Sequence, residues 1–371
     1  MTPLACVIAE EIETTGPMPV ARFMELALNH PEFGYYRTRD PLGAAGDFIT
    51  APETSQMFGE MIGLWSAVVW EALGAPTPFT LAELGPGHGT LMADALRAGR
   101  TKPGFVEAAQ LHLVETSPRL RARQFGALGG FDPVFHDDLA GLPGGPLIVI
   151  ANEFFDALPV RQLIATEGGW AERCIDRHTG PNGGFTFTIG AQAPVGDLPP
   201  TLALDAIPGT IRPGTIRPGT IYEVSPTAQA IASELAGRCA RAPGAALIID
   251  YGHAEFATGE TLQAVRGHAY ADPLSDPGTA DLTAHVDFGA LGRRAHDAGA
   301  TVFRPIGQAR FLLSLGIAAR VKRLMAAATA QQGHDMEAAL RRLLAPWEMG
   351  NLFKVMALAS PDAEFLPGFT N

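Results

Sequence analysis

The fold is decided by one stretch, Thr80-Leu81-Ala82-Glu83-Leu84-Gly85-Pro86-Gly87-His88-Gly89-Thr90-Leu91. Its first residues form a short apolar run that predicts a buried strand, and a helical pattern follows from Leu91. Glycine residues in the turn between them let the backbone approach a ligand without a Cβ clash. The turn lacks the last glycine of the dinucleotide fingerprint G-x-G-x-x-G, because Thr90 occupies that position.

The turn has the pattern E-x-G-x-G-x-G instead. This pattern resembles the first motif of the class I S-adenosylmethionine-dependent methyltransferases, in which the loop wraps the amino-acid part of the cofactor. The resemblance makes Glu83, Gly85, Gly87 and Gly89 candidate cofactor-binding residues. A plain tight turn is the alternative, since a turn with three glycine residues is a weak signal by itself.

Short apolar runs alternate with helical patterns along most of the chain. The runs cover residues 79–84, 111–114, 133–135, 147–151 and 245–249, and two later ones cover 301–304 and 352–358. Runs that are apolar throughout and joined by helices are typical of a parallel sheet covered on both faces. The sequence therefore predicts an α/β fold.

Three segments interrupt or precede this alternation. Residues 1–78 read mainly as helix, with a loop whose Asp47 and Thr50 could close over a cofactor or substrate. Residues 160–220 contain period-2 segments that predict β-hairpins and end in a tandem Pro-Gly-Thr-Ile-Arg repeat, which we interpret as a loop duplication. Residues 307–349 predict a helical insertion. The core would then comprise residues 79–159, 221–306 and 350–360.

Acidic residues end the second and third strands of the core. Glu115 follows the run 111–114, where a carboxylate can accept hydrogen bonds from both ribose hydroxyls of a nucleoside. Asp137 and Asp138 follow the next strand and could meet the edge of an adenine. Helix capping is the alternative for all three residues. Because the carboxyl ends of parallel strands share one edge of a sheet, we expect these side chains to lie near the glycine turn.

The fourth strand ends in Asn152-Glu153-Phe154-Phe155-Asp156. The lone pairs of a guanidinium are delocalised, which makes it a poor nucleophile, and carboxylates can orient it through bidentate hydrogen bonds. Glu153 and Asp156 supply two carboxylates on one turn, and Asn152 begins the motif. We take these three residues as candidate catalytic residues. Solvated loop acids beside a helix start are the alternative.

Six motifs spread over nearly the full length of the chain carry a more specific resemblance. They are Gly46-Asp47-Phe48-Ile49-Thr50-Ala51-Pro52-Glu53, Glu83-Leu84-Gly85-Pro86-Gly87-His88-Gly89-Thr90, Val114-Glu115-Thr116-Ser117-Pro118, Asn152-Glu153-Phe154-Phe155-Asp156-Ala157-Leu158-Pro159, Ile249-Asp250-Tyr251-Gly252-His253 and Ala280-Asp281-Leu282-Thr283-Ala284-His285-Val286-Asp287-Phe288. Together they resemble the MidA-type proteins, relatives of a mitochondrial complex I assembly factor that is a protein arginine methyltransferase.

This resemblance implies a Rossmann-like class I fold with a mostly parallel, seven-stranded sheet and insertions. It also implies S-adenosylmethionine as cofactor and the symmetric dimethylation of an arginine on a protein substrate, with an NADH dehydrogenase (complex I) subunit as the candidate. Two alternatives remain open: a small-molecule methyltransferase, and a non-catalytic assembly factor that binds S-adenosylmethionine.

Composition narrows the classes of protein further. The net charge of −12 lacks the basic footprint of a nucleic-acid-binding protein. The three cysteines suggest a reducing compartment, no His/Cys cluster has the spacing of metal ligands, and no apolar run is long enough to span a membrane. We therefore expect a cytoplasmic bacterial protein without a metal. The sequence carries no prediction of the oligomeric state.

Overall fold

The computed structural model of this chain describes residues 2–39, 43, 46–47, 50–179, 183–194, 202, 217–361 and 363–369. The chain forms two compact units. Unit 1 comprises residues 1–41, 157–227 and 257–285, and unit 2 comprises residues 42–156, 228–256 and 286–371. Residues 208–216 of the tandem repeat lie outside the described residues.

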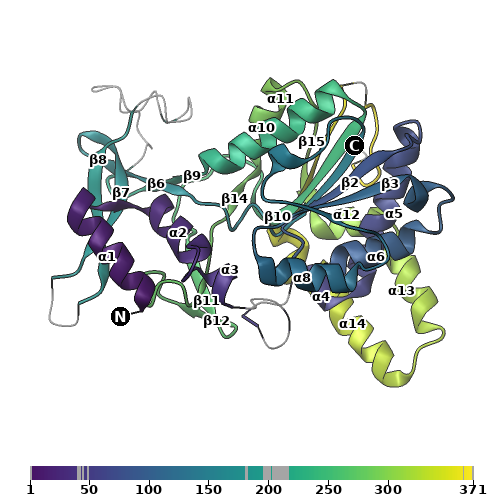
Figure 1. Ribbon diagram of the computed structural model, residues 1–371, viewed down its shortest axis with the longest axis horizontal. Helices are drawn as coiled ribbons and strands as arrows, with labels where there is room; N and C mark the ends of the chain where they lie inside the picture. Colours follow the sequence, from purple (N-terminus) through teal and green to yellow (C-terminus); the bar gives the residue numbers. More distant parts are fainter. Residues whose placement is uncertain are drawn as a thin grey trace. The chain divides into compact units, whose positions relative to one another are not determined.

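Unit 2 is built on a sheet with the strand order β15-β16-β10-β5-β2-β3-β4 (Figure 1). The strands are β2 (Phe79–Leu84), β3 (Ala109–Val114), β4 (Val134–His136), β5 (Leu147–Asn152), β10 (Gly244–His253), β15 (Thr301–Gly307) and β16 (Phe353–Ala359). The five strands from β10 to β4 pair in parallel, whereas β16 is antiparallel to both of its neighbours. A short strand, β14 (Val286–Asp287), pairs in parallel with the end of β10. The predicted mostly parallel, seven-stranded sheet is confirmed.

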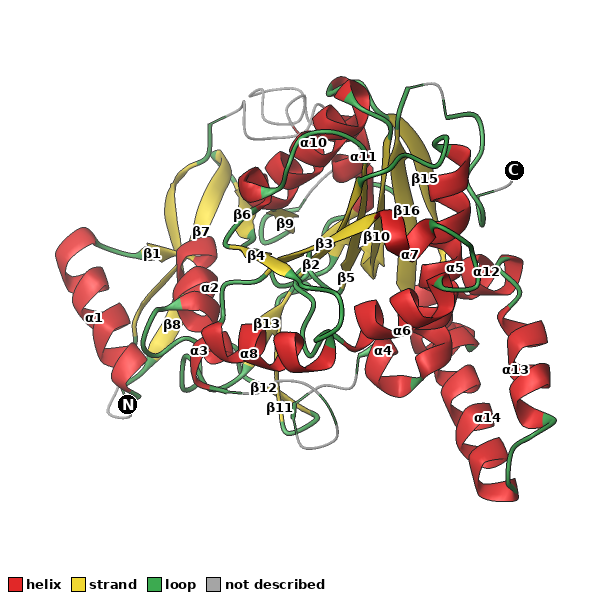
Figure 2. Ribbon diagram, turned by 45° about the vertical axis from the view of Figure 1, so that its right-hand side comes forward, coloured by secondary structure: helices red, strands yellow, loops and turns green. Residues whose placement is uncertain are grey.

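Helices cover both faces of this sheet (Figures 1 and 2). One face carries α10 (Pro226–Arg241) and α11 (Phe288–Asp297), and the other carries α4 (Ala51–Thr54), α5 (Gln56–Ala72) and α6 (Thr90–Gly99). The strands are apolar throughout because both faces are buried, and every residue of β2 and β5 is buried. Shorter helices are α7 (Phe105–Ala108), α8 (Pro118–Ala127) and a 3-10 turn (Leu139–Gly141).

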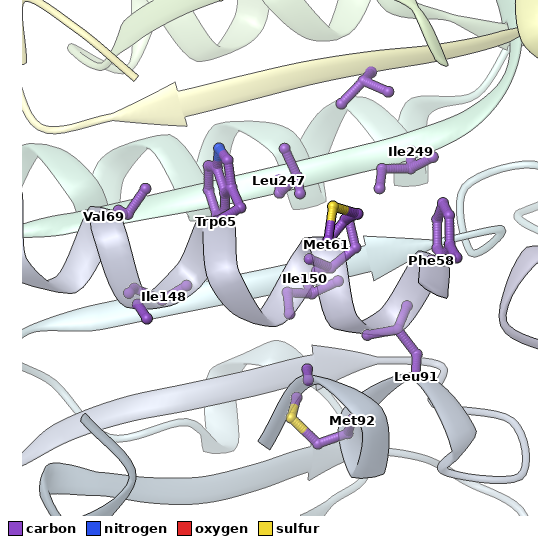
Figure 3. Packing of buried hydrophobic residues seen from close by; sticks show 14 of the residues in the cluster. Phe58, Met61, Trp65, Val69, Leu91, Met92, Ile148, Ile150, Leu247 and Ile249 are labelled. Atoms are coloured by element: carbon purple, nitrogen blue, oxygen red, sulfur yellow. The ribbon is translucent and has the colours of Figure 1, made fainter. Parts of the chain in front are cut away.

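The main core lies between α5 and the sheet. Figure 3 shows Phe58, Met61, Trp65 and Val69 along one side of α5, next to Ile148 and Ile150 of β5 and Leu247 and Ile249 of β10. The four side chains of α5 recur every three or four residues, which is the spacing of one helical face. Gly63 of α5 allows a close approach, since a Cβ there would lie 2.2 Å from the carbonyl oxygen of Ala95 on α6.

The helical insertion lies between β15 and β16. It consists of α12 (Gln308–Ser314), α13 (Ile317–Met325), α14 (Ala330–Leu344) and a π-helical turn (Pro346–Gly350). Phe311, Leu312, Ile317, Val321 and Leu343 join the main core. Among the described residues, none of the helices combines the length and the apolar character that a membrane-spanning helix needs.

Unit 1 has a core of its own. An antiparallel sheet has the order β1-β7-β6-β9, with β8 paired to β7, and a smaller antiparallel sheet has the order β12-β11-β13. The elements are α1 (Pro3–Thr15), β1 (Met18–Pro19), α2 (Val20–Asn29), α3 (Tyr35–Thr38), β6 (Arg161–Thr166), β7 (Gly169–Arg177), β8 (Phe185–Gln192), β9 (Ile221–Val224), β11 (Gln263–Arg266), β12 (Ala269–Ala271) and β13 (Asp281–Thr283).

The units divide the chain differently from the regions expected from the sequence. Residues 1–78 were expected as one helical region, but α1 to α3 belong to unit 1 and α4 and α5 belong to unit 2. Apolar periodicity shows that a helix has a buried face, but not which sheet covers that face. Likewise, β9 and β11 to β13 fall within the expected core region 221–306, yet they belong to unit 1.

Candidate active site

The glycine turn between β2 and α6 has a backbone that side chains rarely allow. Gly85, Gly87 and Gly89 have φ values of 61°, 53° and 81°. A Cβ on Gly85 would lie 2.9 Å from Cδ2 of Phe154. The turn leads directly into α6, and the N–H groups at a helix N-terminus favour a negatively charged ligand group such as a carboxylate. The turn can therefore hold a ligand against bare backbone.

Glu83 is buried beneath this turn, on β2. Glu83 is 3% exposed, and this burial raises the pKa of its carboxyl group to about 8. Among the described residues, its Oε2 atom has no hydrogen-bond partner. A buried acceptor without a partner is costly, so Glu83 is suited to a ligand that brings a donor or a positive charge.

Glu115 and Gln124 form a buried brace next to the glycine turn. The backbone N–H of Ser117 donates to Oε1 of Glu115 at 2.8 Å, and Nε2 of Gln124 donates to Oε2 at 3.1 Å. The same Nε2 donates to the carbonyl oxygen of Gly87 at 2.8 Å. Burial raises the pKa of Glu115. A carboxylate can accept further hydrogen bonds, so both oxygens of Glu115 can still bind hydroxyl groups.

Gln124 was not identified from the sequence, although a signal was present. It is four residues after Leu120 and four before Leu128, and all three are buried on one face of α8 and its C-terminal end. A polar residue on an apolar stripe with this spacing indicates a buried hydrogen-bond network.

Asp137 and Asp138 follow β4 but point to different partners. Nη2 of Arg121 donates to Oδ1 of Asp137 at 2.7 Å, and 85% of the Asp137 side chain is exposed. Oδ1 of Asp138 accepts a hydrogen bond from the backbone N–H of Gly141 at 3.1 Å, so Asp138 caps the 3-10 turn. Asp138 therefore has the capping role that the sequence analysis gave as the alternative to cofactor binding. Contact of either residue with an adenine stays a prediction.

The turn after β5 carries the candidate catalytic residues. Glu153 has a left-handed backbone, with φ of 50°. Its Oε1 accepts hydrogen bonds from the backbone N–H of Ala51 at 3.0 Å and from Nδ2 of Asn152 at 3.2 Å. Burial, together with the charge of Asp156, raises the pKa of Glu153 to about 7, and Ala51, Asn152 and Arg342 oppose that shift. Glu153 can therefore gain and lose a proton near neutral pH.

Asp250, on β10, holds this turn in place. Its Oδ2 accepts hydrogen bonds from the backbone N–H groups of Phe155 at 3.0 Å and Asp156 at 3.2 Å, and its Oδ1 accepts from Tyr251 at 2.9 Å. Asp250 is fully buried, and burial together with the charges of Asp156 and Glu153 raises its pKa well above its usual value. The structure thus brings three carboxyl groups together at one strand edge.

Helix α4 at the start of unit 2 contacts the glycine turn. Oγ1 of Thr90 donates to Oε1 of Glu53 at 2.7 Å, and Nδ1 of His88 lies 3.4 Å from the same oxygen. The carbonyl oxygen of Thr50 accepts the first hydrogen bond of α4. Asp47 is half-buried. Binding of the cofactor by Asp47 and Thr50 stays a prediction.

The last two of the six sequence motifs contain a histidine and an aspartate that make local contacts. Nδ1 of His253 lies 2.7 Å from the carbonyl oxygen of Glu255 and 4.0 Å from Oδ1 of Asp287. Asp287 caps α11 by accepting from the backbone N–H of Ala290 at 2.8 Å. Within the part of the chain that the structure describes, no group of three or more His, Cys, Asp or Glu side chains is arranged to hold a metal ion.

Comparison with known proteins decides the family. Residues 61–306 match the family described as "Putative S-adenosyl-L-methionine-dependent methyltransferase". The chain belongs to this family. The resemblance predicted from the six motifs is confirmed, and S-adenosylmethionine is the cofactor.

Individual relatives agree over nearly the full length. The protein arginine methyltransferase NDUFAF7 homolog, mitochondrial, of Drosophila melanogaster is 36% identical, over 96% of this chain and 84% of the relative. The human protein arginine methyltransferase NDUFAF7, mitochondrial, is 36% identical, over 96% of this chain and 83% of the relative. A crystal structure of a COG1565 superfamily member from Burkholderia thailandensis, bound to S-adenosyl-homocysteine, is 30% identical with a TM-score of 0.83, over 99% of this chain and 94% of that one.

These relatives correct one expectation. The sequence predicted a cytoplasmic protein. The comparison contradicts that prediction, because the curated relatives are mitochondrial proteins. The prediction relied on the three cysteines, which indicate a reducing compartment but do not specify which compartment it is.

The site's residues fit the cofactor of this methyltransferase family. The cofactor carries a positive charge on sulfur and an amino-acid group, and Glu83 is a buried carboxyl group whose Oε2 is without a hydrogen-bond partner among the described residues. The glycine turn has three positive-φ residues without a Cβ, so its backbone can approach the cofactor, and Glu115 offers both carboxylate oxygens at the end of the neighbouring strand.

Proposed function

We propose that this methyltransferase modifies an arginine of a protein substrate, that the product is a symmetric dimethylarginine, and that the substrate is a subunit of the NADH dehydrogenase complex. Support for arginine comes from the named activity of the NDUFAF7 relatives. The single observation that carries the proposal is the cluster of carboxyl groups formed by Glu153, Asp156 and Asp250 at one strand edge.

We further propose how the chain holds its cofactor. The glycine turn of Gly85, Gly87 and Gly89 would take the amino-acid part, with Glu83 beneath it. Glu115 would accept the ribose hydroxyls, and Asp137, Asp138, Asp47 and Thr50 would line the remainder. When bound, the cofactor supplies an electrophilic methyl group on a positively charged sulfur.

The candidate catalytic residues prepare the arginine. A guanidinium keeps its proton in water, so it becomes a nucleophile only where a base accepts a proton as the N–C bond forms. Glu153 suits this role because its pKa is raised to about 7, so that its carboxylate is a stronger base than an exposed glutamate. Asp156 adds negative charge beside it, which favours a guanidinium, and Asn152 fixes the Glu153 carboxyl group by its hydrogen bond.

The test compares the NADH dehydrogenase complex of the source organism with and without this gene. Mass spectrometry of the purified subunits should find an arginine that carries two methyl groups in the first sample and none in the second. Fragmentation that releases monomethylamine identifies the symmetric isomer. An unchanged methylation pattern would contradict the proposed substrate, and binding of S-adenosylmethionine without any methyl transfer would favour a non-catalytic assembly factor.

A further inference from the structure

One tryptophan of unit 2 is exposed where the others of the chain are buried. Trp347 is 80% exposed, whereas Trp65, Trp70 and Trp170 are between 1% and 5% exposed. It lies in the π-helical turn that joins α14 to β16. Single exposed apolar residues are common on proteins, so its position and its neighbours decide whether this one has a role.

The turn is rigidly anchored on both sides of Trp347. Ala345 and Met349 are buried, and the backbone N–H groups of Glu348 and Gly350 both donate to the carbonyl oxygen of Ala345 at 3.0 Å. A Cβ on Gly350 would lie 2.2 Å from the carbonyl oxygen of Leu344, so the chain passes tightly there. The indole is therefore presented to solvent by a fixed backbone.

The turn also lies at the strand edge that carries the candidate catalytic residues. β16 is antiparallel to β10, with Lys354 opposite Asp250, so the residues just before β16 lie at the carboxyl end of β10. Asp250 accepts the hydrogen bonds that hold the turn of Asp156. α14 also packs against α4, and the backbone N–H of Ala51 in α4 donates to Oε1 of Glu153 at 3.0 Å, so α14 lies beside the element that contacts this carboxyl group.

Trp347 offers an indole face to a positive charge. Charges of both signs lie close to it along the chain, with Arg341 and Arg342 at the end of α14 and Glu348 after the indole. Glu348 follows Trp347 directly, its side chain is 35% exposed, and its Oε1 is 4.0 Å from Nε of Arg341. An indole face and a carboxylate are the two groups that attract a guanidinium or ammonium most strongly outside a buried site. Leu352, 46% exposed at the other end of the same segment, extends the apolar surface.

We propose that Trp347 and Glu348 form a docking point for a positively charged side chain of the protein substrate, on the segment that carries the target arginine. The inference rests on the proposed function, because it assumes a protein substrate that brings an arginine to Glu153. The inference assigns to Trp347 and Glu348, which lie outside the catalytic turn, the selection of substrate segments that carry a positive charge.

The position of the tryptophans supplies the first test. Acrylamide quenches exposed indoles much more strongly than buried ones, so Trp347 should account for the quenchable fluorescence, and Trp347→Phe should remove it. The probe is an acetylated Gly-Arg-Gly-Arg-Gly amide peptide, added with S-adenosylhomocysteine. We expect it to lower the quenching constant about twofold, while the same peptide with citrulline in place of arginine leaves the constant unchanged.

The kinetics of methyl transfer, with the unmethylated subunit as substrate, supply the second test. Trp347→Ala should raise KM for the subunit about threefold to tenfold with little change in kcat, and Trp347→Phe should retain most of the affinity, because a phenyl ring still offers a π-face. Glu348→Gln should also raise KM, and added salt should shrink this effect. Tyr270→Ala is the matched control, since Tyr270 is an aromatic residue that is 82% exposed in unit 1.

Two results would overturn the inference while the proposed function stands: no protection of Trp347 by the arginine peptide, or an unchanged KM in Trp347→Ala when the wild-type protein methylates the subunit. A wild-type protein that binds S-adenosylmethionine but methylates no arginine of the subunit would overturn the proposed function, and the docking point with it.

Discussion

The backbone N–H of Asp156 donates a 3.2 Å hydrogen bond to the carboxyl group of Asp250, a residue 94 positions later in the chain. Because Asp250 is fully buried and also accepts from Phe155, it fixes the backbone of the turn that carries the candidate catalytic residues. The geometry of that turn therefore depends on β10 as much as on its own sequence.

Removal of this carboxyl group should weaken both the fold and the activity. Asp250→Ala removes the acceptor of three backbone N–H groups, those of Phe155, Asp156 and Tyr251, and we expect it to lower the free energy of unfolding by about 2 to 4 kcal/mol in urea denaturation. Asp250→Asn keeps one acceptor oxygen and serves as the comparison, with a loss of about 1 kcal/mol. Equal stability of Asp250→Ala and the wild type would show that the hydrogen bonds do not hold the turn.

The glycine turn should tolerate no side chain at its centre. Gly87 has φ of 53°, so Gly87→Val combines backbone strain with a branched side chain at the place proposed for the cofactor. We expect calorimetry to detect no binding of S-adenosylmethionine, with a circular dichroism spectrum like that of the wild type. Gly333→Val is the control, because a Cβ there meets nothing within 4 Å. Unchanged affinity in Gly87→Val would remove the turn from the cofactor site.

Much of the site could be predicted because its signals are local in sequence. β2, the glycine turn and the start of α6 are continuous, so their order along the chain already describes their arrangement. Glu115 and Glu153 could be grouped with them because parallel strands end at a common edge. Glu83 lies within the same stretch.

The remaining features depend on contacts between distant residues. Nothing in the run that contains Asp250 indicates that its side chain accepts from Phe155 and Asp156. The two hydrogen bonds of Gln124 were equally hidden, since an amide side chain has many possible partners. The division of the first helices between two units escaped prediction for a similar reason, because an apolar helix face does not specify its partner.

Gln124 should contribute to cofactor affinity through its two hydrogen bonds. Gln124→Leu keeps a side chain of similar size but removes the donor to the Gly87 carbonyl and to Glu115. We expect the Kd for S-adenosylmethionine to rise about tenfold, which corresponds to about 1.4 kcal/mol. Phe125→Leu, at a position that is 57% exposed on the same helix, is the control. If calorimetry gives the wild-type Kd for Gln124→Leu, the brace does not support the cofactor site.

Glu153 should set the pH dependence of methyl transfer. Its pKa is raised to about 7, and a base must be deprotonated to accept the proton of the guanidinium, so kcat should rise with pH up to about pH 7 and then level off. Glu153→Gln and Asp156→Asn should bind S-adenosylmethionine with the wild-type Kd but lose at least about a hundredfold in kcat. Undiminished turnover in both variants would exclude these residues from the reaction.

Glu83 should make the cofactor-free protein less stable as the pH rises. Its pKa is about 8 in the folded protein and 4.5 when the side chain is in water, so the folded state holds the proton more tightly than the unfolded state. The stabilisation that this proton provides is complete below pH 4.5 and is lost as the pH rises through 8. Glu83→Gln stays neutral throughout, and we expect its free energy of unfolding to exceed that of the wild type by about 1 to 3 kcal/mol at pH 8.

Urea denaturation of both proteins between pH 4.5 and pH 8.5 measures this difference. The gap between Glu83→Gln and the wild type should widen steadily with pH, because only the wild type must bury a charge at the upper end. Glu337→Gln, at an exposed position of α14, should follow the wild-type curve. A gap that stays constant with pH would mean that the Glu83 carboxyl group holds no extra proton in the folded protein, and its assignment as a buried acceptor that waits for a cationic ligand would fail.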